Sequence, residues 1–141
     1  MRVLVDTCVI IDALQSREPF AKDAQRIFLT AANNQFIGCI TAKSATDIYY
    51  LTHRHTHDDR ASRSVLSKLL TIFELLDTAA MDCRHAILSD VSDFEDAVMT
   101  ETAIRAGADC IVTRNISDYT DPRIPVYTPA ELLAKLETTE E

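Results

Sequence analysis

Five aspartates occupy positions from which their carboxylates could act together. Asp6 follows the apolar run "VLV", Asp47 lies inside the helical stretch "TAKSATDIYYL", and Asp118 comes shortly after the apolar run "CIV". Asp93 and Asp96 open the helical stretch "DFEDAVMTETAIR". Carboxylates that converge raise each other's pKa values unless they hold a cation. Because oxygen ligands suit Mg²⁺ or Mn²⁺, which leave positions open for water and phosphate, the chemistry would be phosphoryl transfer or phosphodiester hydrolysis.

Each aspartate also has a purely structural interpretation. Asp6 could cap the helix that follows it, Asp93 could cap the next helix with Asp96 at its third position, and Asp118 could close an Asx-turn. Asp47 is harder to explain in this way, because aspartate has a poor propensity for helix interiors and no Lys or Arg lies four residues further on. A solvent-exposed helix face is the alternative for Asp47.

Two polar residues after the run "CIV" belong to the same candidate set. Thr113 could hydrogen-bond a phosphate or a metal-bound water, or it could cap the turn that follows the strand. Asn115 could orient the same groups as a neutral amide. Both residues therefore stay open between a functional and a structural role.

The elements that would position these side chains alternate along the chain. Short β-branched runs predict strands near 2–6, 36–40, 110–113 and 124–128, and the stretch 72–77 could be a strand or a helix end. Helices are expected near 8–15, 20–33, 42–54, 60–71, 80–89 and 94–106, with Gly107 ending the last of these. A final helix begins after Thr128, where "TPAE" is a capping box.

Uniformly apolar strands separated by helices predict an α/β/α sandwich around a mostly parallel sheet of four to five strands. Ligands of such folds lie at the carboxyl ends of the strands, which is where Asp6 is expected. With 141 residues, the chain is expected to form a single domain over 1–141.

Composition limits the class of protein further. The hydrophobic content is 47% and the charged content 26%, as in globular proteins, and no apolar stretch approaches the ~20 residues that cross a bilayer. We expect no signal peptide, no membrane contact and a cytoplasmic location, because Asp6 and Asp12 interrupt the N-terminal apolar run. The net charge of −8 argues against binding nucleic acid through a basic surplus.

The motifs resemble those of a known family. The stretches "VLVDTCVIIDAL", "TAKSATDIYYL", "DFEDAVMTETAIRAGADCIVTRN" and "TRNISDY", with "TPAELL" at the end, are similar to the successive motifs of PIN domains. The likeness covers essentially the whole chain and is strongest to the small stand-alone type that includes VapC-like toxins. It implies a metal-dependent ribonuclease that hydrolyses phosphodiester bonds of single-stranded RNA with Mg²⁺ or Mn²⁺.

The resemblance also implies a homodimer and, if the chain is the toxin of a toxin-antitoxin pair, a small antitoxin protein as partner. The alternative is a catalytically weak or inactive PIN-like module that binds RNA or a protein. The metal ligands would be Asp6, Asp47 and Asp96, with Thr7, Asp93, Thr113 and Asn115 as auxiliary residues. The family usually has glutamate in place of Asp47 and often a fourth acid in place of Asn115, so either Asp118 takes that catalytic role or three carboxylates suffice.

Under this interpretation, RNA contacts are expected from the part of the chain where positive charge gathers. The candidates are Lys43, Arg54, Arg60 and Arg63. The stretch "HRHTH" at 53–57 lies among them, and its i, i+2, i+4 histidine spacing has no fixed carboxylate or cysteine partner. We expect that stretch to be an exposed loop between two helices rather than a zinc site.

Overall fold

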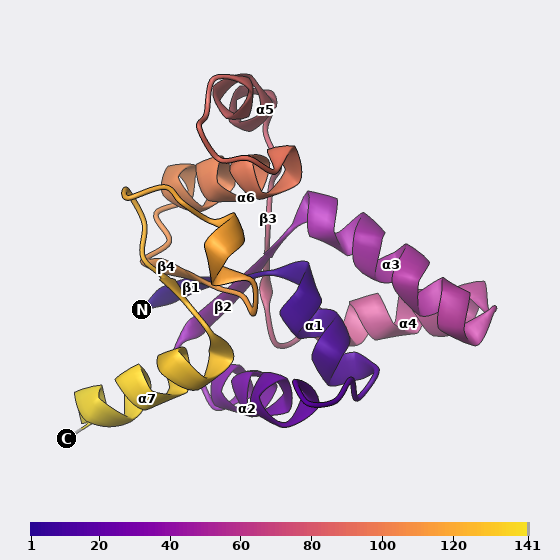
Figure 1. The fold of residues 1–141 in the computed structure, drawn as a ribbon. Helices are drawn as coiled ribbons and strands as arrows, with labels where there is room; N and C mark the ends of the chain where they lie inside the picture. The colour runs from indigo at the N-terminus through magenta and orange to yellow at the C-terminus, as the bar shows by residue number, and fades with distance from the viewer. Residues whose placement is uncertain (141) are drawn as a thin grey trace.

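The computed structural model describes residues 1–140 of the chain, and its centre is a parallel sheet of five strands (Figure 1). The strands are β1 (Arg2–Val5), β2 (Ile37–Thr41), β3 (Glu74–Leu76), β4 (Cys110–Val112) and β5 (Val126–Tyr127). They lie in the order β3-β2-β1-β4-β5, and every neighbouring pair is parallel. The predicted α/β fold is confirmed.

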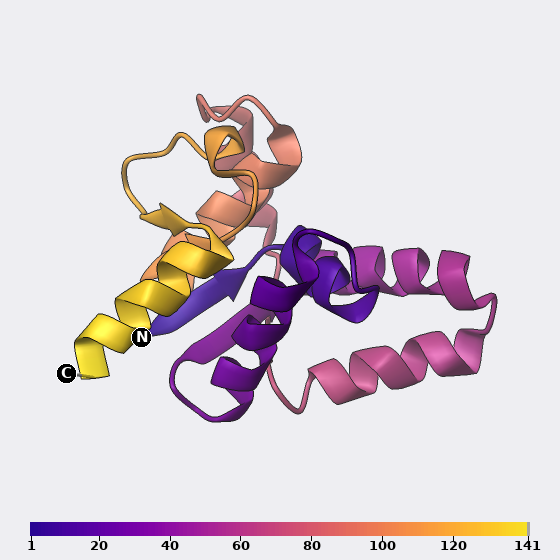
Figure 2. The same ribbon diagram turned by 60° about the horizontal axis from the view of Figure 1, so that its bottom comes forward.

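Helices cover both faces of this sheet. Their bounds are α1 (Thr7–Leu14), α2 (Ala21–Ala32), α3 (Ala42–Thr56), α4 (Asp59–Leu69), α5 (Ala80–Ile87), α6 (Phe94–Arg105) and α7 (Pro129–Glu140), with a 3₁₀ helix η1 (Ile116–Asp118) after β4. Helices α1, α2 and α7 lie on one side of the sheet, and α6 lies on the other with α5 packed outside it. Helices α3 and α4 form a hairpin that extends away from the sheet (Figure 2).

Side chains of β1 alternate between two apolar cores. Val3 and Val5 join the core formed with α1, α2 and α7, whereas Leu4 joins Met99 and Ala103 of α6 on the opposite face. All three β1 residues have no exposed surface. A strand buried on both faces explains why this segment is apolar throughout rather than alternating.

Several predicted helix ends are confirmed by their caps. Asp93 Oδ1 accepts a hydrogen bond from the Asp96 N–H at 3.0 Å at the start of α6, and Gly107 follows that helix with a φ of 73°. Before α7, the Thr128 N–H donates to Glu131 Oε1 at 3.0 Å, and the Glu131 N–H donates to Thr128 Oγ1 at 3.1 Å. This reciprocal pair is the capping box that the sequence predicts.

The structure resolves one ambiguous prediction and corrects another. The ambiguous stretch 72–77 forms β3, which pairs with β2. The loop expected at 53–57 is wrong, because α3 continues to Thr56 and only His57 leaves the helix, with a φ of 55°. The helical hydrogen bonds run on to the end of this stretch, where the His57 N–H donates to the His53 carbonyl at 2.7 Å, and the His53 ring stacks on that of Tyr49 with centroids 5.8 Å apart.

The carboxyl ends of β1, β2 and β4 lie at one edge of the sheet. Residue Asp6 follows β1, Thr113 follows β4, and α3 begins directly after β2. The edge therefore gathers the segments that carry most of the candidate site residues. Within residues 1–140, no helix is both long enough and apolar enough to cross a bilayer.

Candidate metal centre

Asp6 lies between the end of β1 and the start of α1. Its backbone N–H donates to the Val112 carbonyl at 3.0 Å, which ties this turn to β4. Asp6 occupies the N-cap position of α1, yet its side chain makes no capping hydrogen bond within the described chain. Its Oδ2 instead accepts a hydrogen bond from Thr113 Oγ1 at 2.8 Å, and Cys8 Sγ lies 3.6 Å from the same oxygen. The capping interpretation is therefore wrong for the Asp6 side chain.

Thr113 caps the turn after β4, as one of its two predicted roles requires, and also binds Asp6. The residue is fully buried at the end of β4, and its hydroxyl donates to Asp6. The same oxygen accepts from the Asn115 N–H at 3.1 Å, which closes the turn before η1. Thr113 thus caps the turn and fixes the orientation of the Asp6 carboxylate, while the Asn115 side chain remains exposed.

Asp96 faces Asp6 from the opposite side of this edge. It lies in the first turn of α6, where the N-cap Asp93 binds its backbone N–H, and its side chain is partly buried. Burial, and then the charges of Asp6, Asp93 and Asp118, raise the pKa of the Asp96 carboxyl to about 7. Four of the five candidate aspartates are therefore close enough to interact electrostatically.

Tyr119 is a member of this cluster that the sequence interpretation missed. Its side chain is 6% exposed, and burial together with the facing carboxylates of Asp6 and Asp96 raises the pKa of its phenol. The hydroxyl is nevertheless without a hydrogen bond of good geometry to any described residue. The only signal in the sequence was its position next to Asp118, on the loop after β4.

The donor set fits a hard divalent cation. The converging atoms are carboxylate and hydroxyl oxygens, and burial together with the charges of Asp6, Asp93 and Asp118 raises the pKa of Asp96. Among residues 1–140, no group of three or more His, Cys, Asp or Glu side chains is arranged to hold a metal ion. Mg²⁺ is commonly held by one or two carboxylates and several waters, and the carboxylates of Asp6 and Asp96 fit such an ion in type.

The structure does not bring Asp47 into this group. Lys43, one turn earlier on α3, binds Asp47 Oδ2 at 2.5 Å and also pairs with Glu95 of α6. The absence of a basic residue four positions after Asp47 was thus misleading, because the partner lies four positions before it. The Asp47 side chain is 33% exposed and forms an ion pair, so the alternative of a solvent-exposed position without a partner is wrong.

Thr7 connects the centre to α3 rather than pointing to a ligand. Its hydroxyl donates to Ser44 Oγ at 2.9 Å, and Thr41 Oγ1 donates to the same oxygen at 3.1 Å. These bonds join the start of α1 to the start of α3. They set the position of α1, which follows Asp6, relative to α3, which carries Asp47 in its second turn.

The predicted RNA contacts lie on the α3–α4 hairpin. Arg54 and Arg60 are exposed, and the Arg63 side chain pairs with Asp59 at 3.0 Å. Lys43 lies at the other end of α3 and is occupied by its two acidic partners. All four candidates therefore lie on the hairpin, and Lys43 is joined to α6, through Glu95 next to Asp96.

Buried or half-buried ion pairs were not anticipated from the sequence. Asp82 binds Arg105 at 2.8 Å between α5 and α6, and Asp12 binds Arg114 at 2.8 Å between α1 and the turn after β4. Pairs so distant along the chain give no periodic signal. Each needs the tertiary fold to be recognised.

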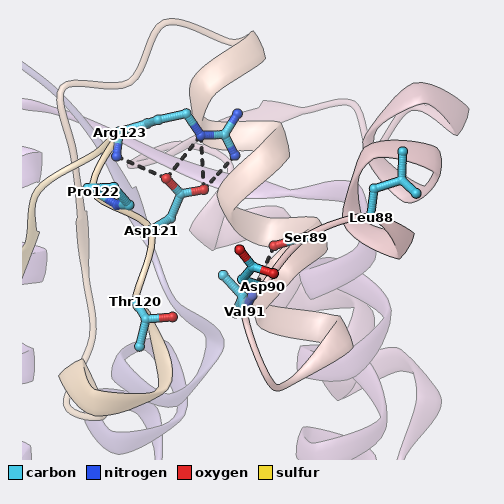
Figure 3. Close-up of a pocket in the computed structure, with 8 residues that line it drawn as sticks. All are labelled: Leu88, Ser89, Asp90, Val91, Thr120, Asp121, Pro122 and Arg123. Carbon is cyan, nitrogen blue, oxygen red and sulfur yellow. Dashed lines mark hydrogen bonds and ion pairs between the residues drawn. The ribbon is translucent and has the colours of Figure 1, made fainter.

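A pocket of about 340 Å³ lies between the α5–α6 loop and the loop that leads to β5. Figure 3 shows its lining residues, which are Leu88, Ser89, Asp90, Val91, Thr120, Asp121, Pro122 and Arg123. Arg123 is neutralised there by Asp121 at 2.5 Å, and Glu101 lies 2.6 Å from the same guanidinium. None of the acids clustered with Asp96 lines this pocket, so it is separate from the candidate metal centre.

Comparison with known proteins agrees with this geometry. A family model described as a PIN domain matches residues 2–117. No curated protein shows significant sequence similarity to the chain.

Solved structures share the fold at low sequence identity. A toxin-antitoxin complex from Klebsiella pneumoniae matches with a TM-score of 0.67 and 18% identity, covering 90% of this chain and 97% of that one. VapBC2 from Rickettsia felis, bound to a DNA fragment from its promoter, matches with a TM-score of 0.65 and 18% identity over 89% and 97% of the two chains. VapC20 of Mycobacterium tuberculosis, a toxin that cleaves the sarcin-ricin loop, matches with a TM-score of 0.61 and 16% identity over 77% and 86%.

Proposed function

The chain belongs to the PIN domain family, and from that premise we propose that it is a divalent-metal-dependent endoribonuclease of single-stranded RNA. The observation that carries the proposal is the pairing of Asp6 and Asp96 across the carboxyl edge of the sheet. Burial and neighbouring acids raise the pKa of Asp96 to about 7, which supports a group of acids that a bound cation would stabilise.

Asp6 and Asp96 would hold a Mg²⁺ or Mn²⁺ ion, directly or through water, and Asp118 would add a further oxygen from η1. Such an ion neutralises the scissile phosphate and lowers the pKa of a bound water. Asp47 would reach the ion through water or after release from Lys43. Its side chain is one methylene shorter than the usual glutamate, so an outer position suits it.

The remaining residues would orient and screen the reacting groups. Thr113 donates a hydrogen bond that would orient the Asp6 carboxylate, and the buried Tyr119 ring would limit the access of water to Asp6 and Asp96. Exposed arginines on the α3–α4 hairpin, Arg54 and Arg60, would bind RNA phosphates further from the scissile bond. Asn115, exposed beside the turn, would orient the phosphate as a neutral amide.

The proposed protein partner is inferred from similar structures. The Klebsiella and Rickettsia neighbours are toxin-antitoxin assemblies, and we propose that this chain is likewise the toxin of such a pair. Its partner would be a small antitoxin protein encoded beside it. A homodimer and a cytoplasmic location, both expected from the sequence, stay predictions.

The decisive experiment is cleavage of an unstructured, end-labelled RNA by the purified protein with Mn²⁺ and with EDTA. We expect internal cleavage that needs the metal and is lost in Asp6→Asn and Asp96→Asn. Asp23→Asn, which changes an aspartate of α2 far from the centre, is the matched control and should cleave like the wild type. Metal-independent cleavage, or equal cleavage by Asp96→Asn, would rule out the metal centre.

The alternative of an inactive binding module gives a different result. In that case the wild type binds the RNA with a measurable dissociation constant and leaves it intact at every Mn²⁺ concentration. Growth arrest on expression, relieved by co-expression of the adjacent reading frame, tests the toxin role separately. A cleaving protein with no effect on growth would retain the nuclease proposal and reject the toxin.

A further inference from the structure

A buried ion pair lies beside the metal centre without belonging to it. Arg114 Nε donates to Asp12 Oδ2 at 2.8 Å. The Asp12 side chain is 2% exposed, and that of Arg114 is 29% exposed. Asp12 lies on α1, which starts after Asp6, and Arg114 directly follows Thr113, so the pair spans the two segments that form the Asp6 side of the centre.

The pair uses only part of the guanidinium. Arginine and carboxylate groups commonly pair through two parallel hydrogen bonds, but the second oxygen of Asp12 is buried without a partner among the described residues. Within residues 1–140, the terminal nitrogens of Arg114 likewise make no hydrogen bond, and the guanidinium lies over the Phe20 ring, 4.5 Å from its centroid. Asp12 and Phe20 thus hold the group in place while leaving its outer donors available.

This guanidinium is close to Asp6. Cys8 and Asp12 are four residues apart on one face of α1, about one turn or 5.4 Å along the helix axis. Cys8 Sγ lies 3.6 Å from Asp6 Oδ2. The same sulfur lies 3.5 Å from Thr113 Oγ1, which donates to Asp6 Oδ2 at 2.8 Å, and Arg114 is the residue that follows Thr113.

Two other arginines that bind acids of α5 and α6 are already neutralised. Arg123 pairs with Asp121 and Glu101, and Arg105 pairs with Asp82 through two of its nitrogens. Arg114 differs because one anchored nitrogen fixes the group and the others point to no described acceptor. A pre-oriented planar fork of this kind suits a phosphate, which accepts two parallel hydrogen bonds.

We propose that Arg114 forms a phosphate subsite that binds a phosphodiester of single-stranded RNA next to the scissile one. The inference rests on the proposed ribonuclease function and adds a positioning contact to it. Arg114 offsets the repulsion between the RNA backbone and the acidic cluster on the side where Asp6 lies. Asp12 acts through Arg114, as the anchor that keeps its fork at the surface.

Equilibrium binding in EDTA measures this contact without cleavage. Fluorescence anisotropy of a labelled, unstructured RNA is recorded between 50 and 200 mM salt, conditions in which each single-strand phosphate contact contributes about 0.7 to the slope of log K against log salt. We expect Arg114→Met to reduce that slope by about 0.7. Arg26→Met removes the same charge from α2, where Arg26 pairs with Asp23 and Glu137, and should leave the slope unchanged.

Steady-state cleavage with Mn²⁺ separates substrate positioning from fold support. We expect Arg114→Met to raise KM about tenfold, the loss of one charge-assisted hydrogen bond, with kcat within about twofold of wild type. Arg114→Lys keeps the positive charge but lacks the planar guanidinium. We therefore expect the slope of log K against log salt to stay at the wild-type value while KM rises. Should Arg114→Met fail to fold, Arg114→Lys and Asp12→Asn supply the same comparison, and Asp12→Asn should raise KM by releasing the anchor.

The outcomes distinguish this inference from the function on which it rests. A wild type that neither binds nor cleaves RNA rejects both. A wild type that cleaves RNA, with an unchanged salt slope in Arg114→Met, rejects the phosphate subsite alone. A fall in kcat at constant KM, together with a lower melting temperature, assigns the ion pair to structural support and also rejects it.

Discussion

The hydroxyl of Thr113 lies 2.8 Å from a carboxylate oxygen of Asp6, although the two residues are 107 positions apart in the chain. Strands β1 and β4 are neighbours in the sheet, so their carboxyl ends place the two side chains together. The donated hydrogen bond restricts Asp6 to one orientation. Such support of a ligand commonly decides whether a metal site is formed well enough to bind.

Replacing Thr113 by valine tests this relationship. The substitution keeps the side-chain shape and removes the donor, so we expect the Mn²⁺ dissociation constant to rise about tenfold, as for other residues that orient metal ligands. Isothermal titration calorimetry measures the affinity directly. Thr30→Val is the control, because its hydroxyl bonds only to the Arg26 carbonyl on α2. Equal affinities in wild type and Thr113→Val would mean that Asp6 does not ligate the ion.

Asp96→Asn should stabilise the metal-free protein while weakening metal binding. The neutral amide removes repulsion with Asp6 and Asp93, and the capping bond to the Asp96 N–H involves only its backbone. We expect a melting temperature about 3 °C higher at pH 8 in EDTA, the shift for roughly 1 kcal/mol in a domain of this size. With saturating Mg²⁺ the order should reverse, because only the wild type gains from the ion. A large loss of stability in EDTA would instead make Asp96 a structural residue.

The same carboxyl predicts a dependence on pH. Its pKa is raised from 3.8 to about 7 in the folded protein, so the folded state retains this proton longer than the unfolded state does. The associated stability is fully present below pH 3.8 and is lost as pH rises through 7. The melting-temperature gap between Asp96→Asn and wild type in EDTA should therefore be small at pH 5 and widest at pH 8. A gap that is constant with pH would contradict the raised pKa.

We propose that Lys43 and a metal ion compete for the Asp47 carboxylate. Removing its ammonium in Lys43→Met frees both Asp47 and Glu95, and we expect the Mn²⁺ affinity to rise about two- to fivefold, in line with the energy of a partly exposed ion pair. Calorimetric titration measures it, with Lys68→Met on the exposed end of α4 as the charge-matched control. An affinity unchanged in both Lys43→Met and Asp47→Asn would place Asp47 outside the metal site.

Either residue 115 or residue 118 could supply the fourth side-chain ligand of the proposed metal site. Asp118 is near enough to contribute to the raised pKa of Asp96, so we expect Asp118→Asn to weaken Mn²⁺ binding several-fold and Asn115→Asp to change it little. The reverse result, in which Asn115→Asp tightens binding and Asp118→Asn has no effect, would assign the position to residue 115. Both variants lie on the exposed loop after β4, so neither should disturb the core.

Local order was predictable because it depends on nearby residues. The capping box at Thr128 and Glu131, the N-cap at Asp93 and the glycine end of α6 are satisfied within four residues of chain, so their sequence signals are complete. The uniformly apolar β1 likewise indicated a parallel sheet with both faces covered. The loop expected at 53–57 failed because the helical hydrogen bonds of α3 continue to the His57 N–H, which donates to the His53 carbonyl.

What the sequence determined by itself was the order of strands and helices and the presence of acids at their ends. The tertiary structure decided which acids meet: Asp96 faces Asp6 and Tyr119, whereas Asp47 turns to Lys43. It also decided that Arg114 is anchored on Asp12. The physical reason is that a carboxylate pairs with whichever charge or donor lies within a few ångströms, and sheet order and helix packing set those distances between residues far apart in the chain.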